Sequence, residues 1–173
     1  MQANQFTAVQ LAQLRRLPQR ISKWALEIHC AAALYHLDPL VIAAILERES
    51  KGGDALMPPG PRGKGDGGHG HGLMQLDDRW HKPFIATGLW AEAAPAMVYA
   101  ARLLRQGLDA FGGDYPETIG SYNAGIGGVR RALADLPADA SLEKRVAAID
   151  KATTDAYVAG VLWLREVFET AIV

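Results

Sequence analysis

The spacing of apolar residues predicts a chain built mainly from helices. Over the first fifty residues, apolar side chains recur three and four positions apart, the period of one helix face, at Leu11, Leu14, Ile21, Trp24, Ala25, Ile28, Ala31, Ala32 and Tyr35. Pro18 should interrupt this run. Asp38 suits the N-cap and Pro39 the first position of a new helix, which we expect to end by Gly52 and Gly53.

The rest of the chain has one glycine-rich segment followed by further helices. Nine of the eighteen glycines lie in residues 52–72, together with Pro58, Pro59 and Pro61, so a helix cannot persist there. We interpret this segment as a functional loop, with room for a short β-hairpin. Helical spacing returns over residues 91–111, and shorter helices are predicted around 116–122, 127–136, 141–149 and 156–168.

The composition is that of one folded domain. Of the 173 residues, 49% are hydrophobic and 21% are charged, which is enough to build a core and too apolar for a disordered chain. No repeat or linker divides the sequence. We therefore expect a single domain, with residues 1–37 as an N-terminal helical extension and residues 38–173 as the core.

Charge and cysteine content narrow the classes of ligand. The formal net charge is −1, so no broad basic field favours nucleic acid, and a neutral or sugar-like ligand fits better. Cys30 is the only cysteine, which excludes an internal disulfide and a thiolate-rich metal site. No stretch reaches the roughly 20 apolar residues of a spanning helix, and no secretory signal is visible, so we expect neither membrane insertion nor a signal peptide.

Glu49 is the first candidate for acid chemistry. It continues an apolar stripe at helical spacing, so its carboxyl should point inward. Burial disfavours the charged form of a carboxyl, and a carboxyl that keeps its proton near neutrality can act as a general acid. Glu47 faces about 150° away from the stripe and should be solvated. The alternative for Glu49 is a helix-end carboxylate paired with Arg48 or Lys51. The stripe before Glu49 consists of Ile42, Ile45 and Leu46.

A series of short motifs follows along the chain. They are Glu49-Ser50, Gly65-Asp66, Gly72-Leu73-Met74-Gln75-Leu76-Asp77, then Arg79 with His81-Lys82-Pro83, and Ser121-Tyr122-Asn123-Ala124-Gly125. Their order resembles the goose-type lysozymes, within the wider group that includes the soluble lytic transglycosylases, over about residues 38–165. The resemblance implies a mainly α, α+β lysozyme-like fold in which the glycine-rich loop or a small β-hairpin lines a glycan cleft.

The resemblance also implies three catalytic carboxylates. The family's general acid lies in a helix-terminal Glu-Ser pair, which matches Glu49. Its hydrolases carry two aspartates, matching Asp66 and Asp77, whereas lytic transglycosylases typically lack that pair. An inverting glycosidase needs a second carboxylate to activate water, and either aspartate is a candidate. The alternatives are an Asx-turn at Asp66 and a helix cap at Asp77. Asp78 is expected to be an exposed neighbour.

Polar and aromatic residues are candidates for substrate binding. Amide, phenol and imidazole groups can hydrogen-bond sugar hydroxyls and N-acetyl groups, and the resemblance places such residues along the glycan. The candidates are Gln75, His81, Tyr122, Asn123, His71 and Tyr157. A core aromatic with a satisfied hydroxyl is the alternative for Tyr122.

The sequence does not favour a metal site. His69, His71 and His81 with the two aspartates invite that interpretation, because alternate histidines on an extended strand share one face. The spacing fits no common zinc signature, and the resemblance implies chemistry without metal or cofactor. His69 and His71 stand where the family more often has Asn and an aromatic residue, so they are expected to tune substrate contacts.

The resemblance implies an enzyme that cuts peptidoglycan glycan strands. The main prediction is a muramidase, a glycoside hydrolase in which Glu49 protonates the leaving oxygen while Asp66 or Asp77 directs water. The alternative is a lytic transglycosylase that forms 1,6-anhydro ends with Glu49 as acid and then base. A third interpretation is a catalytically silent glycan-binding or virion structural protein.

The expected substrate constrains where the protein works. Peptidoglycan lies outside the cytoplasm, whereas the sequence predicts synthesis in the cytoplasm without a signal peptide. Another delivery route would bring such a protein to its substrate: release by a phage, transport on a virion, or a secretion system. We favour phage lysis. The expected partners are peptidoglycan glycan strands, with no nucleic acid, and the protein is expected to be a monomer.

Overall fold

The computed structural model describes residues 8–173, which form two compact units. The first contains the chain up to Ala101 together with Arg165–Val173, and the second is Arg102–Leu164. The expectation of a single domain, including residues 1–7, which lie outside the described residues, stays a prediction. Each unit is considered by itself below.

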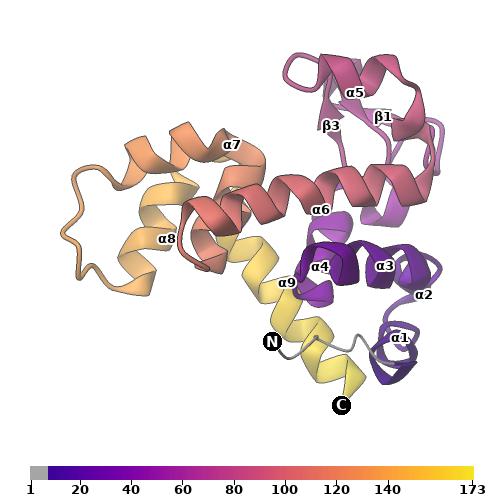
Figure 1. Ribbon diagram of the computed structural model, residues 1–173, viewed down its shortest axis with the longest axis horizontal. Coiled ribbons are helices and arrows are strands. Elements are labelled where there is room, and N and C mark those ends of the chain that lie inside the picture. The colour runs from indigo at the N-terminus through magenta and orange to yellow at the C-terminus, as the bar shows by residue number, and fades with distance from the viewer. Residues whose placement is uncertain (1–7) are drawn as a thin grey trace. The chain divides into compact units, whose positions relative to one another are not determined.

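Four helices open the first unit (Figure 1). They are α1 (Ala8–Leu14), α2 (Gln19–Ser22), α3 (Ala25–Tyr35) and α4 (Pro39–Ser50). Pro18 stands directly before α2, as predicted. Asp38 caps α4 by accepting a 2.8 Å hydrogen bond from the backbone N–H of Leu40, and Pro39 takes the first helical position. Both predicted start signals are therefore confirmed.

Helix α4 is the central helix of this unit. Its residues from Leu40 to Leu46 are all buried, and α3 and α2 pack against it. The helix is therefore apolar on every side until its last turn, where Arg48 is exposed and Glu49 is half-buried. Other buried side chains of this unit include Ile21, Ile28, Leu73, Met74 and Met97.

The expectation of a solvated Glu47 is wrong. Its side chain is only 10% exposed, and both carboxylate oxygens accept hydrogen bonds of 2.8 to 3.1 Å from the Arg20 guanidinium. Helix α2 packs on α4 and brings Arg20 to that face. A charged residue outside the apolar stripe of a helix thus lies under a neighbouring helix instead of in water.

The glycine-rich segment forms the small hairpin structure that the sequence predicted. After the 3₁₀ turn η1 (Lys51–Gly53), strands β1 (Lys64–Gly65), β2 (Gly70–His71) and β3 (Leu76–Asp77) form an antiparallel sheet in that order. The 3₁₀ turn η2 (Asp66–Gly68) joins β1 to β2. The loop is thus a short sheet that presents residues 66–71 and 76–78 from neighbouring strands.

Helix α5 (Lys82–Ala86) and the 3₁₀ turn η3 (Leu89–Ala91) follow the sheet, and neither was predicted. Both are short, and α5 contains no buried residue, so no apolar residues at helical spacing predict this helix from the sequence. The predicted helix over residues 91–111 is confirmed as α6 (Ala93–Ala110).

The second unit is centred on α7 (Tyr115–Leu133) and α8 (Leu142–Asp150), which pack side by side (Figure 1). Two helices were predicted where α7 runs, and their division corresponds to Gly125, whose φ of 72° and ψ of 157° are not helical. Ser141 caps α8 with its side-chain oxygen. Helix α9 (Tyr157–Ile172) begins in this unit, as predicted.

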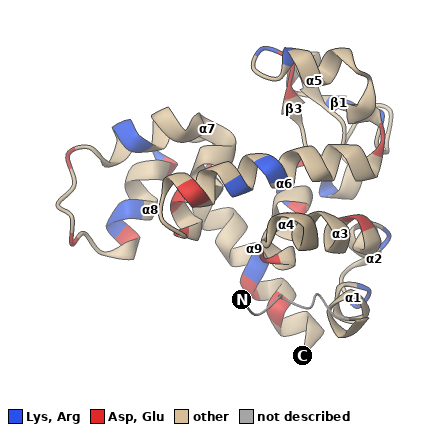
Figure 2. Cartoon of the chain, in the orientation of Figure 1, with Lys and Arg blue, Asp and Glu red and all other residues tan. Residues whose placement is uncertain are grey.

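Basic and acidic residues are interspersed along the elements of both units (Figure 2). This agrees with the formal net charge of −1. Among the described residues, 8–173, no helix combines the length and apolarity required to cross a membrane.

Candidate active site

Glu49 lies in the last turn of α4, at a helix end that is fixed by its neighbours. The buried Ser50 accepts a 3.1 Å hydrogen bond from the backbone N–H of Gly53 through its side-chain oxygen. Lys51 and Gly52 adopt left-handed conformations, with φ of 50° and 64°, which turn the chain out of the helix. The carboxyl of Glu49 is therefore carried by a rigid element at the edge of the buried core.

The structure brings the two predicted aspartates together through Arg79. The Arg79 guanidinium donates a 2.8 Å hydrogen bond to Oδ2 of Asp66 and binds both oxygens of Asp77, with Nε at 2.9 Å from each. Asp66 comes from η2 and Asp77 from β3, so one cation joins two adjoining segments of the sheet. We call Asp66, Arg79 and Asp77 the carboxylate clamp.

The two carboxylates of the clamp differ in how much of their bonding capacity is used. Oδ1 of Asp77 accepts from the backbone N–H of Arg79 at 2.7 Å and from Nε, and Oδ2 accepts from Nε and Nη2. A carboxylate offers about four acceptor sites, and three N–H donors of Arg79 engage Asp77, because the single N–H of Nε is shared between its two oxygens. These hydrogen bonds from Arg79 hold the pKa of Asp77 below its usual range.

Asp66 is the more available carboxylate. Its side chain is 65% exposed, and among residues 8–173 it accepts one hydrogen bond, from Arg79 to Oδ2. Its backbone has a φ of 47°, a left-handed conformation that Asp tolerates better than most residues. Arg79 thus engages Asp77 through three donors and Asp66 through one, so Asp66 has the greater capacity for a further hydrogen bond.

Asp78 forms a second cluster with two histidines. Nδ1 of His69 lies 2.9 Å from Oδ1 of Asp78, and Nε2 of His71 lies 3.1 Å from Oδ2. Both histidines therefore reach the same carboxylate. Hydrogen bonds from His69 and then His71 lower the pKa of Asp78. Instead of being the exposed neighbour that was expected, Asp78 is half-buried and fastens η2 and β2 to the end of β3.

The other candidates in the first unit pack against protein. His71 is buried with its ring edge-on to Trp90 at 4.6 Å between centroids. Nδ1 of His81 lies 3.1 Å from the hydroxyl of Tyr99, which in turn stacks on Phe84. Within residues 8–173, no group of three or more His, Cys, Asp or Glu side chains has the geometry to hold a metal ion.

Gln75 lies over the hairpin backbone. Its amide nitrogen donates a 2.8 Å hydrogen bond to the carbonyl of Gly72. A methyl group added to Gly65 or Gly70, which face each other across β1 and β2, would collide with its amide oxygen. A side chain at either position would therefore displace the amide end of Gln75.

Three candidate substrate-binding residues belong to the second unit. Tyr122 is half-buried, and Tyr157 is buried at the start of α9. Asn123 is exposed and pairs with Thr154 through two 3.3 Å hydrogen bonds, which involve both its amide nitrogen and its oxygen. Asn123 thus holds the loop before α9, and the roles of all three in substrate binding stay predictions.

Arg79 and Asp78 are the site residues whose roles the sequence did not reveal. The motif series includes Arg79 without assigning it a role, and the sequence predicts that Asp78 is an exposed neighbour. The available signal was the Asp77-x-Arg79 spacing in a turn, where an arginine can reach back to a carboxylate two residues earlier.

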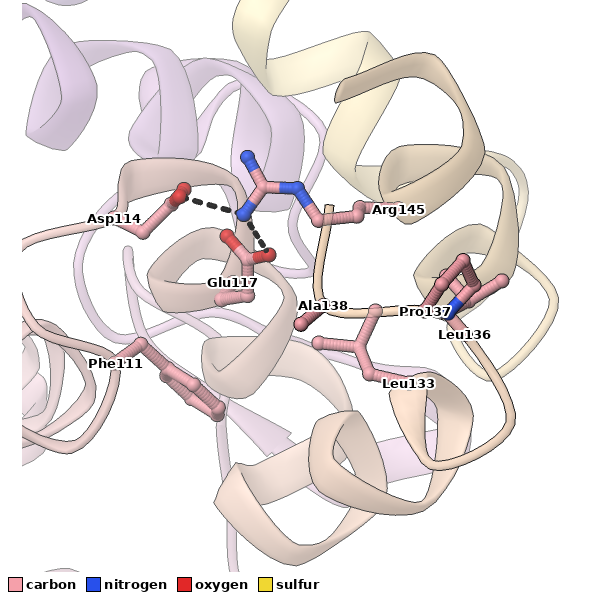
Figure 3. A pocket seen from close by; sticks show the side chains of 8 residues that line it. All are labelled: Phe111, Asp114, Glu117, Leu133, Leu136, Pro137, Ala138 and Arg145. Carbon is pink, nitrogen blue, oxygen red and sulfur yellow. Dashed lines mark hydrogen bonds and ion pairs between the residues drawn. The ribbon is translucent and has the colours of Figure 1, made fainter. Parts of the chain in front are cut away.

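A buried charge cluster in the second unit was also missed. Nη1 of Arg145 on α8 donates 2.7 Å hydrogen bonds to Asp114 and to Glu117 at the start of α7 (Figure 3). These residues line a pocket of about 240 Å³ with Phe111, Leu133, Leu136, Pro137 and Ala138. Burial and the hydrogen bond to Asp114 raise the pKa of Glu117 to about 7.

The stability of the protein should therefore depend on pH through Glu117. The unfolded chain loses the proton of this carboxyl near pH 4.5, whereas the folded chain keeps it to about pH 7. Unfolding free energy should thus fall between these values, on the order of 3 kcal/mol, and stay lower above pH 7. Urea unfolding at pH 5 and pH 8 measures this difference. Glu117→Gln should remove most of it, and an equal difference in the variant would assign the effect elsewhere.

Comparison with known proteins agrees with the sequence motifs. The family model described as Lysozyme g matches residues 10–106. Lysozyme g of Struthio camelus is 38% identical over 103 residues, covering 54% of this chain and 47% of that protein. Lysozyme g of Gallus gallus is 36% identical over 103 residues, covering 54% of this chain and 45% of that protein. The chain belongs to the lysozyme g family, as predicted, and spans about half the length of these relatives.

The matched region includes only part of the candidate site. Glu49 and the carboxylate clamp lie within residues 10–106, whereas Tyr122, Asn123 and Tyr157 lie beyond it. The match also covers most of the N-terminal helices, which the motif comparison had left outside. The matched part of the chain therefore runs from α1 through the sheet and α5 into α6.

Proposed function

We propose that this protein is a muramidase, which hydrolyses the β-1,4 bond between N-acetylmuramic acid and N-acetylglucosamine in peptidoglycan. Membership of the lysozyme g family supports the substrate class. The observation that carries the reaction type is the carboxylate clamp, because it supplies a second carboxylate besides Glu49. The proposed place of action is the peptidoglycan outside the cytoplasm.

In the proposed mechanism, Glu49 protonates the glycosidic oxygen as the bond to the anomeric carbon breaks. Water attacks that carbon from the opposite face and loses a proton to an aspartate, so one proton is given and one is taken in each cycle. Positive charge develops on the sugar ring in the transition state, and the ionised carboxylates stabilise it. The configuration of the anomeric carbon is inverted.

We assign the water-activating role to Asp66. A base needs a free acceptor site, and three N–H donors of Arg79 engage Asp77, whereas one engages Asp66, which is largely exposed. Arg79 screens the repulsion between the two carboxylates and fixes their spacing. Asp77 is then a positioning residue, which acts by holding Arg79.

Analysis of the products tests the function and this assignment together. Purified peptidoglycan digested by the wild type should yield muropeptides with reducing muramic ends, one water heavier by mass spectrometry than anhydro ends. Asp66→Asn should lower kcat by about 10²-fold or more, as expected for loss of a general base, and Asp77→Asn should lower it less.

The other possible outcomes of this experiment would each replace a different part of the proposal. Anhydro ends would replace the proposal with a lytic transglycosylase, in which the muramic 6-hydroxyl takes the place of water. No cleavage by the folded wild type would favour a silent glycan-binding or virion protein. A larger loss in Asp77→Asn than in Asp66→Asn would reverse the roles of the two aspartates.

A further inference from the structure

Trp80 is the most exposed aromatic side chain of the described residues, and it stands directly beside the carboxylate clamp. Its side chain is 80% exposed. Its backbone N–H donates a 3.1 Å hydrogen bond to the carbonyl of Asp77, and the N–H of His81 donates to the same carbonyl at 2.9 Å. The turn that carries Trp80 is therefore fixed to the clamp, although its indole is not covered.

The four tryptophans differ in exposure: Trp80 and Trp163 are largely exposed, whereas the other two contact the protein. Trp24 donates from Nε1 to the carbonyl of Gly52, and Trp90 packs against His71. Within residues 8–173, no hydrogen bond or ring contact engages the indole of Trp80, so the fold gains little from it. A large aromatic ring left in water gains free energy when a ligand covers it, and Trp80, unlike Trp163, directly follows a residue of the carboxylate clamp.

The neighbours of Trp80 indicate a ligand with one apolar face and polar edges. Arg79 precedes it with a half-exposed side chain, and the same guanidinium donates a hydrogen bond to Asp66. A protein interface or membrane contact would require a contiguous apolar patch, whereas here one ring is flanked by charges. Pyranose rings linked β-1,4 fit, because their axial C–H groups make a face that packs on an aromatic ring while their hydroxyls lie at the edge.

We infer that Trp80 is a stacking platform for one N-acetylated pyranose ring of the glycan, beside the carboxylate clamp. The inference rests on the proposed function and deepens it. The indole face supplies area for contact at little entropic cost, because its backbone is already held by the turn. Arg79 and Asp66 then receive the polar edge of the same ring or of its neighbour. Trp80 is a binding residue and takes no part in proton transfer.

Binding of a soluble glycan tests the inference. In the full chain carrying Glu49→Gln, which prevents cleavage, titration calorimetry with a β-1,4-linked hexamer of N-acetylglucosamine should give a measurable Kd. Adding Trp80→Ala should weaken binding at least tenfold, and adding Trp80→Phe should weaken it less because a ring remains. Trp163→Ala is the matched control, since Trp163 is 61% exposed on α9 and is assigned no role. It should leave the Kd unchanged.

Kinetics provide a second measurement. With Glu49 intact, Trp80→Ala should raise the KM for solubilised peptidoglycan about tenfold and change kcat by less than threefold. An unchanged Kd and KM in folded Trp80→Ala, or an equal loss in Trp163→Ala, would overturn the inference. Failure of the proposed function is distinguishable, because the wild type would then cut no glycan, whatever residue stands at position 80.

Discussion

Glu49→Gln should reduce peptidoglycan cleavage by two to four orders of magnitude without unfolding the protein. The amide has nearly the shape of the acid but carries no transferable proton, so the leaving oxygen would depart as an alkoxide. Loss of a general acid typically costs about 10²- to 10⁴-fold. The residue lies in the last turn of α4, half-buried at the edge of the core. The replacement should therefore leave the helix intact.

The measurement is release of muropeptides from purified peptidoglycan, with kcat and KM determined separately. The expected loss is in kcat, because the glycan still binds. Glu47→Gln is the matched control. It removes a carboxylate two residues earlier on the same helix, and with it the ion pair with Arg20. It should lower stability and spare kcat. Comparable activity of Glu49→Gln and the wild type would exclude Glu49 as the acid.

The helices and hairpin could be predicted because local signals mark them. Asp38 and Pro39 begin α4 by a side-chain cap and a preset φ, which depend only on neighbouring residues. The density of glycines in residues 52–72 likewise predicts turns that need positive φ, and several of those glycines have a positive φ in the structure. Helix starts and turns of this kind can be predicted from neighbouring residues, without knowledge of the rest of the chain.

Pairing between distant residues could not be predicted in the same way. Glu47 and Arg20 are 27 positions apart, and Arg145 and Glu117 are 28 apart. Glu47, considered on its own helix, falls outside the apolar face and predicts solvation. Only the packing of α2 on α4, and of α8 on α7, turns these charges into buried or half-buried pairs. The periodicity of one helix contains no information about its neighbour.

The candidate site was predicted in part for the same reason. Glu49, Asp66 and Asp77 were found through motifs, and the structure adds that Arg79 joins the two aspartates. Which aspartate is available to water depends on the number of hydrogen bonds that each accepts. That number is a property of the folded turn and is not encoded in residue type.

Gly52→Ala should destabilise the protein by about 3 kcal/mol or more, because two costs combine. Gly52 has a φ of 64°, which costs a residue with a Cβ roughly 1 to 2 kcal/mol. A Cβ there would also overlap the backbone carbonyl oxygen of Arg20, which cannot rotate away as a side chain could. Relieving such an overlap by backbone movement typically costs about 1 to 3 kcal/mol more. The carbonyl of Gly52 also accepts from Trp24, so the shift would strain a second contact.

Gly88→Ala separates the two costs. Gly88 has a φ of 75°, yet a Cβ there would have no atom within 4 Å. Urea unfolding should show a loss of about 1 to 2 kcal/mol for Gly88→Ala and clearly more for Gly52→Ala. Since Gly52 fixes the end of the helix that carries Glu49, its replacement should also lower kcat, whereas Gly88→Ala should not. Equal stability of the two variants would mean that the close approach to Arg20 is relieved at no cost.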